Sequence, residues 1–547
     1  MALPEGDNDS GSAETPEDFG DDAAGLVKRY LTEIRVYDRG VKDWQEKVKK
    51  IVERYRNTRV SQDLTARRKY ALLWSTIQTQ TPALFARVPV PVVERRWKDA
   101  EDVIASTAAE VLDRALTYTL EMGQFKPAVD GSVFDYQIAG RGVVWLRKEV
   151  DHGDPIENDE GEANDPESEE EVVREVLNER IAVDEVPYSD FGHNLGRNWK
   201  EVHLVWRRIY MSREQLRARF KGKTKDGQPI ADQVELDHMP VEVTKDQETP
   251  LPPHLYKLAT VYELWDKTTK EAIWVAVGYK DAPLDRQADP LGLTDFFPCP
   301  RPIWSSLDTT SLIPMPDYCQ WEDQAREVDD LTQRIHRLIG AARVRGGYDA
   351  TIPELAQLFE ESIELDFIPI NKWMEFASKG GLKGSMDFIP LENFITALSQ
   401  LYEAREQAKR DASEINGVGD IIRGQNAGPE KTATESRISG QFGTLRLQDR
   451  QKEIQRFCRD IIRMMGEMIA EGFLPETLQQ MTGIVLPTAL EKQMAQGLVD
   501  QDKAYQAWKS QQGQAGPASN AGPSNGPSTA PPTPSPAAAA GSMPQAA

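Results

Sequence analysis

The triplet Gly222-Lys223-Thr224 comes closest, in residue types and order, to a site that could do chemistry. In a phosphate-binding loop, backbone N–H groups surround the phosphates and a lysine of this kind reaches them. The motif also requires a glycine where Arg217 stands, and it follows a strand, whereas the preceding segment SREQLRARF is predicted to be helical. We therefore interpret the triplet as a basic turn, with nucleotide hydrolysis as the alternative.

The rest of the sequence offers no catalytic or metal-binding pattern. It contains no GxGxxG, HExxH or GxSxG motif, and adjacent carboxylates such as Asp329 and Asp330 point to different sides of a helix. We predict no catalytic residue, no metal and no cofactor. The three cysteines, Cys299, Cys319 and Cys458, lack CxxC spacing, and we expect them to be reduced and mostly buried. The six histidines lack the spacing of a metalloprotease site, and they are His152, His193, His203, His238, His254 and His336.

Composition limits the class of protein. The chain has 547 residues, and 65 lysines and arginines against 88 aspartates and glutamates give a net charge of -23. Such a charge argues against a protein whose whole surface grips nucleic acid by releasing phosphate counterions, and the length predicts two or more lobes. The N-terminus lacks the basic and apolar regions of a signal peptide, and no apolar run approaches the roughly 20 residues of a membrane span. We expect a soluble protein that is intracellular when made.

The first part of the chain is predicted to be mainly helical. Residues 1–22 carry too little apolar surface to offset the entropy of ordering, and we expect a disordered acidic arm. Apolar residues at helical spacing predict helices over residues 23–56, interrupted near Gly40, and over 63–87 and 99–122. The segment RVPVPVVERRW between the last two is predicted to be extended, because its prolines bias their neighbours away from helix.

A β-rich region follows. Gly140 and Gly142 lie in a run suited to a strand over residues 138–150. The acidic insertion 157–171 is interpreted as a solvated surface segment, with a cation or partner site as the alternative. Further strands complete an antiparallel or mixed sheet, with a hairpin across DKTTKE, and they cover residues 179–186, 202–207, 259–265 and 272–277.

The second half of the chain contains three long amphipathic helical patterns. One covers residues 317–344, another begins at residue 391, and a third begins with the capping-box spacing of Thr432 and Glu435. The polar, Gly-rich break INGVGDIIRGQNAGPE between the last two must be a loop. Between the first two lie short extended runs, glycine turns and a short helix over residues 354–359.

Four segments of the chain carry a resemblance to a known family, and they are GRGVVWLRKEV, SLIPMPDYCQWEDQAREVDDLTQRIHRLIGAARVRGGYDA, INKWMEFASKGGLKGSMDFIPLE and EKTATESRISGQFGTLRLQDRQKEIQRFCRDIIR. Taken as a set, they resemble the portal proteins of tailed bacteriophages, and more closely those of short-tailed and related phages. Together they cover most of residues 140–463, and they are family-style blocks rather than catalytic signatures. The resemblance implies a non-enzymatic dodecameric ring at one capsid vertex, through which the terminase motor pumps double-stranded DNA and through which the DNA later leaves.

The resemblance also implies an architecture, an α+β and predominantly helical fold of the portal type. The expected parts, in chain order, are 1–22 (disordered acidic arm), 23–314 (wing, helices and then a β-rich part with the acidic insertion), 315–344 (stem helix), 345–390 (small α/β clip), 391–414 (stem helix), 415–431 (channel loop), 432–471 (long wing helix), 472–509 (short helical crown) and 510–547 (disordered tail).

Partners and site residues follow from the same resemblance. The clip would meet the terminase large subunit and then the head-to-tail adaptor and tail proteins. The ring would contact major capsid and scaffolding proteins, in the host cytoplasm before assembly and in the virion afterwards, with no membrane. Candidates for touching DNA, with ordinary solvated residues as the alternative, are Arg423, Gln425, Asn426, Lys431, Lys409 and Arg410. Ring closure requires heterologous contacts between subunits, for which the candidates are Arg326, Asp330, Arg334, Arg337, Glu403 and Arg405.

Two other classes stay open. A nucleotide-dependent subunit of the packaging apparatus would rest on Gly222-Lys223-Thr224. A helical scaffold or assembly protein is disfavoured by the strand-rich middle of the chain.

Overall fold

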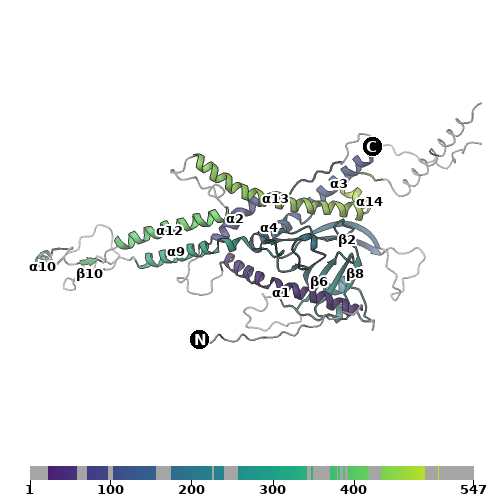
Figure 1. Cartoon of the computed structure of the whole chain (residues 1–547), viewed down its shortest axis with the longest axis horizontal. Helices are drawn as coiled ribbons and strands as arrows, with labels where there is room; N and C mark the ends of the chain where they lie inside the picture. Colours follow the sequence, from purple (N-terminus) through teal and green to yellow (C-terminus); the bar gives the residue numbers. More distant parts are fainter. Residues whose placement is uncertain are drawn as a thin grey trace, which may run out of the picture. The chain divides into compact units, whose positions relative to one another are not determined.

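The computed structural model describes residues 22–57, 70–95, 103–155, 174–224, 227–239, 257–341, 346–348, 370–378, 380–381, 386–388, 392–417, 433–486 and 503. The chain divides into two compact units, residues 1–472 and 473–547. The predicted acidic arm, the acidic insertion, the helix over 354–359, the Gly-rich loop from residue 418 onward and the C-terminal tail lie outside the described residues. The described residues form an α+β protein, as predicted (Figure 1).

Helix α1 (Ala23–Tyr55) begins at Asp22, whose side chain accepts a hydrogen bond from the backbone N–H of Gly25. Its buried residues recur at helical spacing along its whole length. The predicted interruption at Gly40 is wrong, because α1 runs through this residue. A glycine costs a helix about 1 kcal/mol, which the burial of flanking side chains such as Tyr37 and Val41 outweighs.

Helix α2 (Leu72–Leu84) is shorter than predicted at both ends, since residues 70 and 71 are not helical and the helix ends at Leu84 rather than near residue 87. Residues 85–95, which include Pro89 and Pro91, then run without helix or strand, as expected. Helix α3 (Val103–Met122) follows and agrees with the predicted helix over its described part.

Helix α4 (Phe125–Ala139) is not in the predicted set of helices, and the predicted strand over residues 138–150 is wrong at its start. The helix ends at Gly140, whose φ of 84° is a left-handed conformation that glycine adopts without strain. Ten of its fifteen residues are buried, so it lacks the one-sided pattern that marks a surface helix.

The strands after α4 are antiparallel in every described pairing. Strands β2 (Val144–Pro155) and β3 (Arg174–Glu185) form one hairpin, and β1 (Arg141–Gly142) pairs with β9 (Ile303–Trp304). A five-stranded sheet has the order β4-β5-β6-β7-β8 and consists of Phe191–His193, Leu204–Met211, Ala259–Asp266, Glu271–Ala276 and Asp285–Ala288. The hairpin predicted across DKTTKE is confirmed, because Asp266 pairs with Glu271.

The two faces of the five-stranded sheet are buried in separate apolar clusters, because successive side chains of a strand point to opposite faces. One face packs against α1 and α2 through Leu204, Trp206, Tyr262, Leu264, Ile273 and Val275. The other face packs against α5 (Arg213–Arg219), α6 (Ile230–Gln233) and the loop around Phe296 through Val205, Val261, Trp265, Ala272, Trp274 and Ala276.

Helices α9 (Glu322–Ala341) and α12 (Glu392–Asn416) lie side by side (Figure 1). Between them in the chain lie α10 (Trp373–Ser378) and the antiparallel pair β10 (Gly346–Tyr348) and β11 (Met386–Phe388). A 3-10 turn, η2 (Asp317–Gln320), precedes α9, so the predicted helix over residues 317–344 begins with a tighter turn. The order of helix, small α/β part and helix is as predicted.

Helix α13 (Ala433–Gly472) follows the Gly-rich break and has the predicted extent. The side chain of Gln451 donates a 2.6 Å hydrogen bond to the carbonyl oxygen of Ala83, at the end of α2. At its C-terminus, the ammonium of Lys148 donates a 2.5 Å hydrogen bond to the carbonyl oxygen of Gly472. The second unit contains α14 (Pro475–Thr482), which ends at Gly483 with a φ of 69°. None of the helices in the described ranges combines the length and apolar character needed to cross a bilayer.

Candidate functional surfaces of the helical pair

The base of the pair formed by α9 and α12 is part of the large apolar cluster that contains α1. From α9 the cluster takes Ala325, Val328 and Leu331, and from α12 it takes Ala408 and Ala412. The ring of Tyr318, in η2, meets the ring of Trp321 edge to face at a centroid distance of 4.8 Å. The two helices are therefore anchored to the same core as the sheet.

Asp329 lies on the buried side of α9 and joins three elements. Its carboxylate forms an ion pair with Arg54 near the end of α1 and accepts a 2.7 Å hydrogen bond from the backbone N–H of Tyr70, just before α2. The neighbouring Asp330 is exposed. From the sequence alone, the two carboxylates differ only in the side of the helix to which they point.

The ring of Tyr70 extends the same junction to α12. The ammonium of Lys409 lies 4.3 Å from its centroid, and the guanidinium carbon of Arg405 lies 5.9 Å from it. Both cations also approach the carboxylate of Glu406, at 2.8 Å and 3.4 Å respectively. Partial burial opposes ionisation of Glu406, but hydrogen bonds and charge from these two cations outweigh it and lower its pKa.

This junction bears on two of the candidate residues. The side chains of Lys409 and Arg405 are only 16% and 18% exposed, and both are engaged within the subunit. Arg410, in contrast, is exposed and forms no ion pair with any residue of the described ranges. The other four DNA-contact candidates, Arg423, Gln425, Asn426 and Lys431, lie outside the described residues.

The remaining interface candidates lie on the surface of the pair. Asp330, Arg334, Arg337 and Glu403 are exposed, and none forms an ion pair inside the described part of the chain. Arg326 is also exposed and pairs with Glu322 one helical turn earlier, at 2.5 Å. The structure thus brings charges of both signs to the outer sides of α9 and α12.

The turn at Lys223 differs from a phosphate-binding loop. It follows the helix α5 instead of a strand, and its backbone forms an isolated antiparallel bridge with Pro229. The N–H of Thr224 donates to the carbonyl oxygen of Gln228, and only the four-residue helix α6 follows. The strand, loop and long helix that surround a phosphate in that motif do not occur at this turn.

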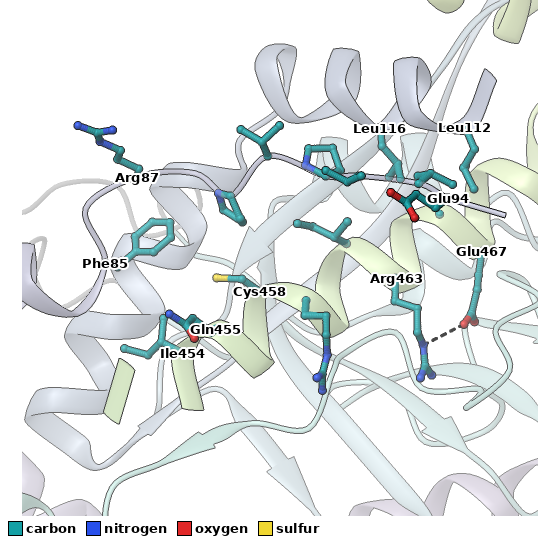
Figure 2. A pocket seen from close by; sticks show the side chains of 18 of the residues that line it. Phe85, Arg87, Glu94, Leu112, Leu116, Ile454, Gln455, Cys458, Arg463 and Glu467 are labelled. Atoms are coloured by element: carbon teal, nitrogen blue, oxygen red, sulfur yellow. Dashed lines mark ion pairs between the residues drawn. The ribbon is translucent and has the colours of Figure 1, made fainter. Parts of the chain in front are cut away.

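A second surface feature is an open groove of about 910 Å³ between residues 84–94, α3 and α13 (Figure 2). Leu112 and Leu116 of α3 lie on one side, and Ile454 and Cys458 of α13 lie opposite. Burial raises the pKa of the Cys458 thiol to about 12. Charged side chains also line the groove, namely Arg87, Glu94, Arg459, Arg463, Glu467 and Glu471.

Helices α3 and α13 pack against each other beside the groove. A Cβ atom added to Gly466 of α13 would lie 3.8 Å from the Leu116 side chain of α3, at ordinary van der Waals distance. Arg463 pairs with Glu467 at 3.2 Å, as Figure 2 shows, and with Asp295 at 3.1 Å. With its apolar floor and charged rim, the groove has the chemistry of a surface that buries one side of an amphipathic segment.

Arg141 is a central residue that sequence reasoning missed. Its side chain is 1% exposed and donates hydrogen bonds to the hydroxyl of Tyr37 at 2.6 Å and to the carbonyl oxygens of Tyr188 and Phe191, both at 2.8 Å. Its guanidinium carbon lies 4.8 Å from the ring centroid of Trp44. The only signal in the sequence is its place between Gly140 and Gly142, where an added Cβ would come too close to Ser305 and to Ser132 respectively.

Two buried titratable groups lie near Arg141. Burial raises the pKa of Asp135 to about 7, although its carboxylate accepts a 2.7 Å hydrogen bond from the backbone N–H of Tyr188. Burial, with a smaller contribution from Arg141, lowers the pKa of His193 to about 3. These shifts have the sign that desolvation alone predicts, so we interpret both groups as structural.

Among the described residues, no group of three or more His, Cys, Asp or Glu side chains is placed to hold a metal ion. All three cysteines are free thiols. Comparison with protein-family models and with curated proteins gives no match for this chain.

Proposed function

We propose that this protein is a portal protein, a ring at the capsid vertex that serves as the channel for DNA packaging and ejection. The observation that supports the proposal is the pairing of α9 with α12, with the small β10 and β11 unit between them in the chain and a shared base on the core that contains α1. In this proposal α9 and α12 are the stem and residues 345–390 are the clip. The Gly-rich break is the channel loop, α13 is the long wing helix and α14 belongs to the crown.

The charge of the chain is compatible with this role. A channel through which DNA slides must hold few phosphates, because each neutralised phosphate adds about 0.9 to the salt dependence of binding. The chain carries a net charge of -23, and on α12 the cations Lys409 and Arg405 are paired with Glu406 inside the subunit. The proposed partners are the terminase large subunit, the adaptor and tail proteins, and the capsid and scaffolding proteins.

Electron microscopy of the purified full-length protein tests the proposal. We expect closed rings with an axial channel, twelve-fold if the resemblance holds in detail, and no ATP hydrolysis with or without DNA. Particles that stay monomeric at low and high salt and at all protein concentrations would overturn it. DNA-stimulated ATP hydrolysis that Lys223→Ala abolishes would instead favour a packaging enzyme.

A further inference from the structure

We propose that one ordered water molecule is bound between Thr76 of α2 and Gln137 of α4, in a small cavity beside the end of α12 and the side of α13. The cavity has a volume of about 20 Å³. One water needs roughly 10–15 Å³ of accessible space, whereas sites for organic ligands measure roughly 300 Å³ or more. The cavity lies within one copy of the chain, so its occupant is independent of the proposed function.

The walls of the cavity are mostly buried. Thr76 and Gln137 are only 3% and 5% exposed, and the apolar side chains of Leu73, Ile77 and Trp321 line the cavity as well. Bulk solvent does not reach polar atoms at this depth, so each of them needs a partner in the protein or a bound water.

The orientation of the Gln137 carboxamide follows from its neighbour Thr81. The Thr81 hydroxyl donates a 2.8 Å hydrogen bond to the carbonyl oxygen of Ile77, so its own oxygen is left to accept. Nε2 of Gln137 lies 3.0 Å from that oxygen and donates to it. The remaining atom of the carboxamide is therefore the oxygen Oε1, for which no donor occurs within the described ranges. A buried oxygen in this state destabilises a protein, and a water that donates to it removes the penalty.

Thr76 differs from the other threonines of its helix. The hydroxyls of Thr79 and Thr81 each donate a 2.8 Å hydrogen bond to the carbonyl oxygen four residues earlier. The hydroxyl of Thr76 has no hydrogen-bond partner in the part of the chain that the structure describes. A hydroxyl carries one donor and two acceptor positions. Thr76 and Gln137 therefore offer the cavity a hydroxyl and a carboxamide oxygen, which one water molecule can engage together.

The charges around the cavity favour a neutral occupant. Asp317 and Arg450 both line it and pair with each other at 2.7 Å, so the site contains one charge of each sign. The guanidinium opposes a cation, and the carboxylate opposes an anion. Buried waters typically make about three hydrogen bonds. Thr76 and Gln137 supply two, and the amide of Gln80, which also lines the cavity, can supply the third.

The position of the cavity gives the water a structural role. Asn416, the last residue of α12, lines the cavity, and so does Arg450 of α13. Helix α12 ends before Gly417, whose φ of 75° is a left-handed conformation, and the rest of the Gly-rich break follows. The two helices that flank the break therefore reach the same polar junction with α2 and α4. The water holds the end of α12 in place where the break leaves it.

Electron microscopy or crystallography of the unmodified full-length protein, at a resolution that shows ordered waters, tests the site directly. We expect a density peak at hydrogen-bond distance, roughly 2.7–3.2 Å, from Oγ1 of Thr76 and from Oε1 of Gln137. A well-defined map without a peak there would overturn the proposal.

The variant Thr76→Val tests the site by the sign of its effect. Valine has nearly the same shape but no hydroxyl, so it takes one partner away from the water and should lower the urea midpoint of unfolding by about 0.3 M. If nothing is bound, the same change removes a buried hydroxyl that has no partner, and the midpoint should stay the same or rise. That second result would contradict the proposal. The matched control is Thr79→Val, which removes a hydroxyl bonded to its own helix and should shift the midpoint little.

Ion dependence identifies a competing occupant. With a water in the site, the urea midpoint of the unmodified protein should be equal in sodium, potassium and choline salts at the same ionic strength. A midpoint that is higher in one alkali salt, with the difference lost in Thr76→Val, would show a bound cation and overturn the proposal. None of these measurements depends on ring formation, so their failure is distinguishable from failure of the proposed function.

Discussion

The backbone N–H of Tyr70 donates a 2.7 Å hydrogen bond to the carboxylate of Asp329, which ties the start of α2 to the middle of α9. The same carboxylate forms an ion pair with Arg54 of α1, and the ring of Tyr70 covers Lys409 of α12. The Asp329 carboxylate and the Tyr70 ring together therefore connect four helices at the base of the pair. This arrangement predicts that the position of α9 and α12 depends on a few residues far from their exposed ends.

Replacing Asp329 with alanine should destabilise the protein by about 3 kcal/mol. The substitution leaves the partly buried Arg54 without its partner and the Tyr70 N–H without an acceptor, and breaking such a pair costs about 3–5 kcal/mol before relaxation. Urea unfolding followed by tryptophan fluorescence measures the change. The matched control is Glu327→Ala on the exposed side of the same helix, which should change stability by less than about 0.5 kcal/mol. Equal effects of the two substitutions would show that Asp329 is not a structural anchor.

Arg141→Met should destabilise the protein by about 3–5 kcal/mol. Methionine has nearly the right volume, but it leaves the carbonyl oxygens of Tyr188 and Phe191 without the N–H donors that satisfy them now. Thermal unfolding checks this expectation. Arg180→Met, an exposed arginine paired with Glu149 at the surface, is the control and should have a small effect. A small effect at both positions would contradict the role assigned to Arg141.

Asp135 should make the protein less stable as the pH rises from about 4 to 7. Its pKa is raised to about 7 in the folded protein, mainly by burial, while in the unfolded chain it is near 4. The folded state therefore binds the proton more tightly. The contribution to stability is fully present below about pH 4, is lost as the pH rises through this window and is on the order of 4 kcal/mol. The charges of Glu185 and Asp190 also raise the pKa of Asp135, and the charge of Arg141 lowers it.

The Asp135→Asn variant isolates this contribution, because asparagine cannot ionise but keeps an oxygen for the Tyr188 N–H. Relative to the unmodified protein, the variant should gain stability steadily between pH 4 and pH 7 and gain no more above that range. Asp130→Asn, on the exposed side of α4, should show no such trend. Unfolding curves at several pH values that stay parallel for the Asp135 variant would refute the expected titration.

Deleting residues 424–428 from the Gly-rich break should leave ring assembly intact and impair DNA packaging or retention. This expectation follows from the proposed function, in which the break is a channel loop and not a structural contact. Packaged DNA is measured by nuclease protection, and rings by electron microscopy. A deletion of equal length in the acidic insertion, residues 160–164, is the control and should affect neither. Loss of the rings on deleting residues 424–428 would show that the loop is structural.

The sequence by itself determined the elements whose pattern is local. The helical spacing of apolar residues predicted α1, α3, α9, α12 and α13, and alternating apolar residues around a turn predicted the hairpin of β6 and β7. These predictions succeed because a helix or strand with one buried side must repeat apolar residues with its own period. The α+β class followed from the same patterns.

The tertiary structure decided the features that depend on which residues pack against a given side chain. Helix α4 is buried around most of its circumference, so no periodic pattern marked it, and Gly40 stays helical because its neighbours are buried. Tertiary contacts also distinguish Asp329, which binds Arg54 and Tyr70, from the adjacent exposed Asp330. The register of α9 against α12 likewise comes from tertiary contacts, such as those of Tyr70 with Asp329 and Lys409. Residue spacing along one chain cannot set the register between two helices, since only the contacts between them fix it.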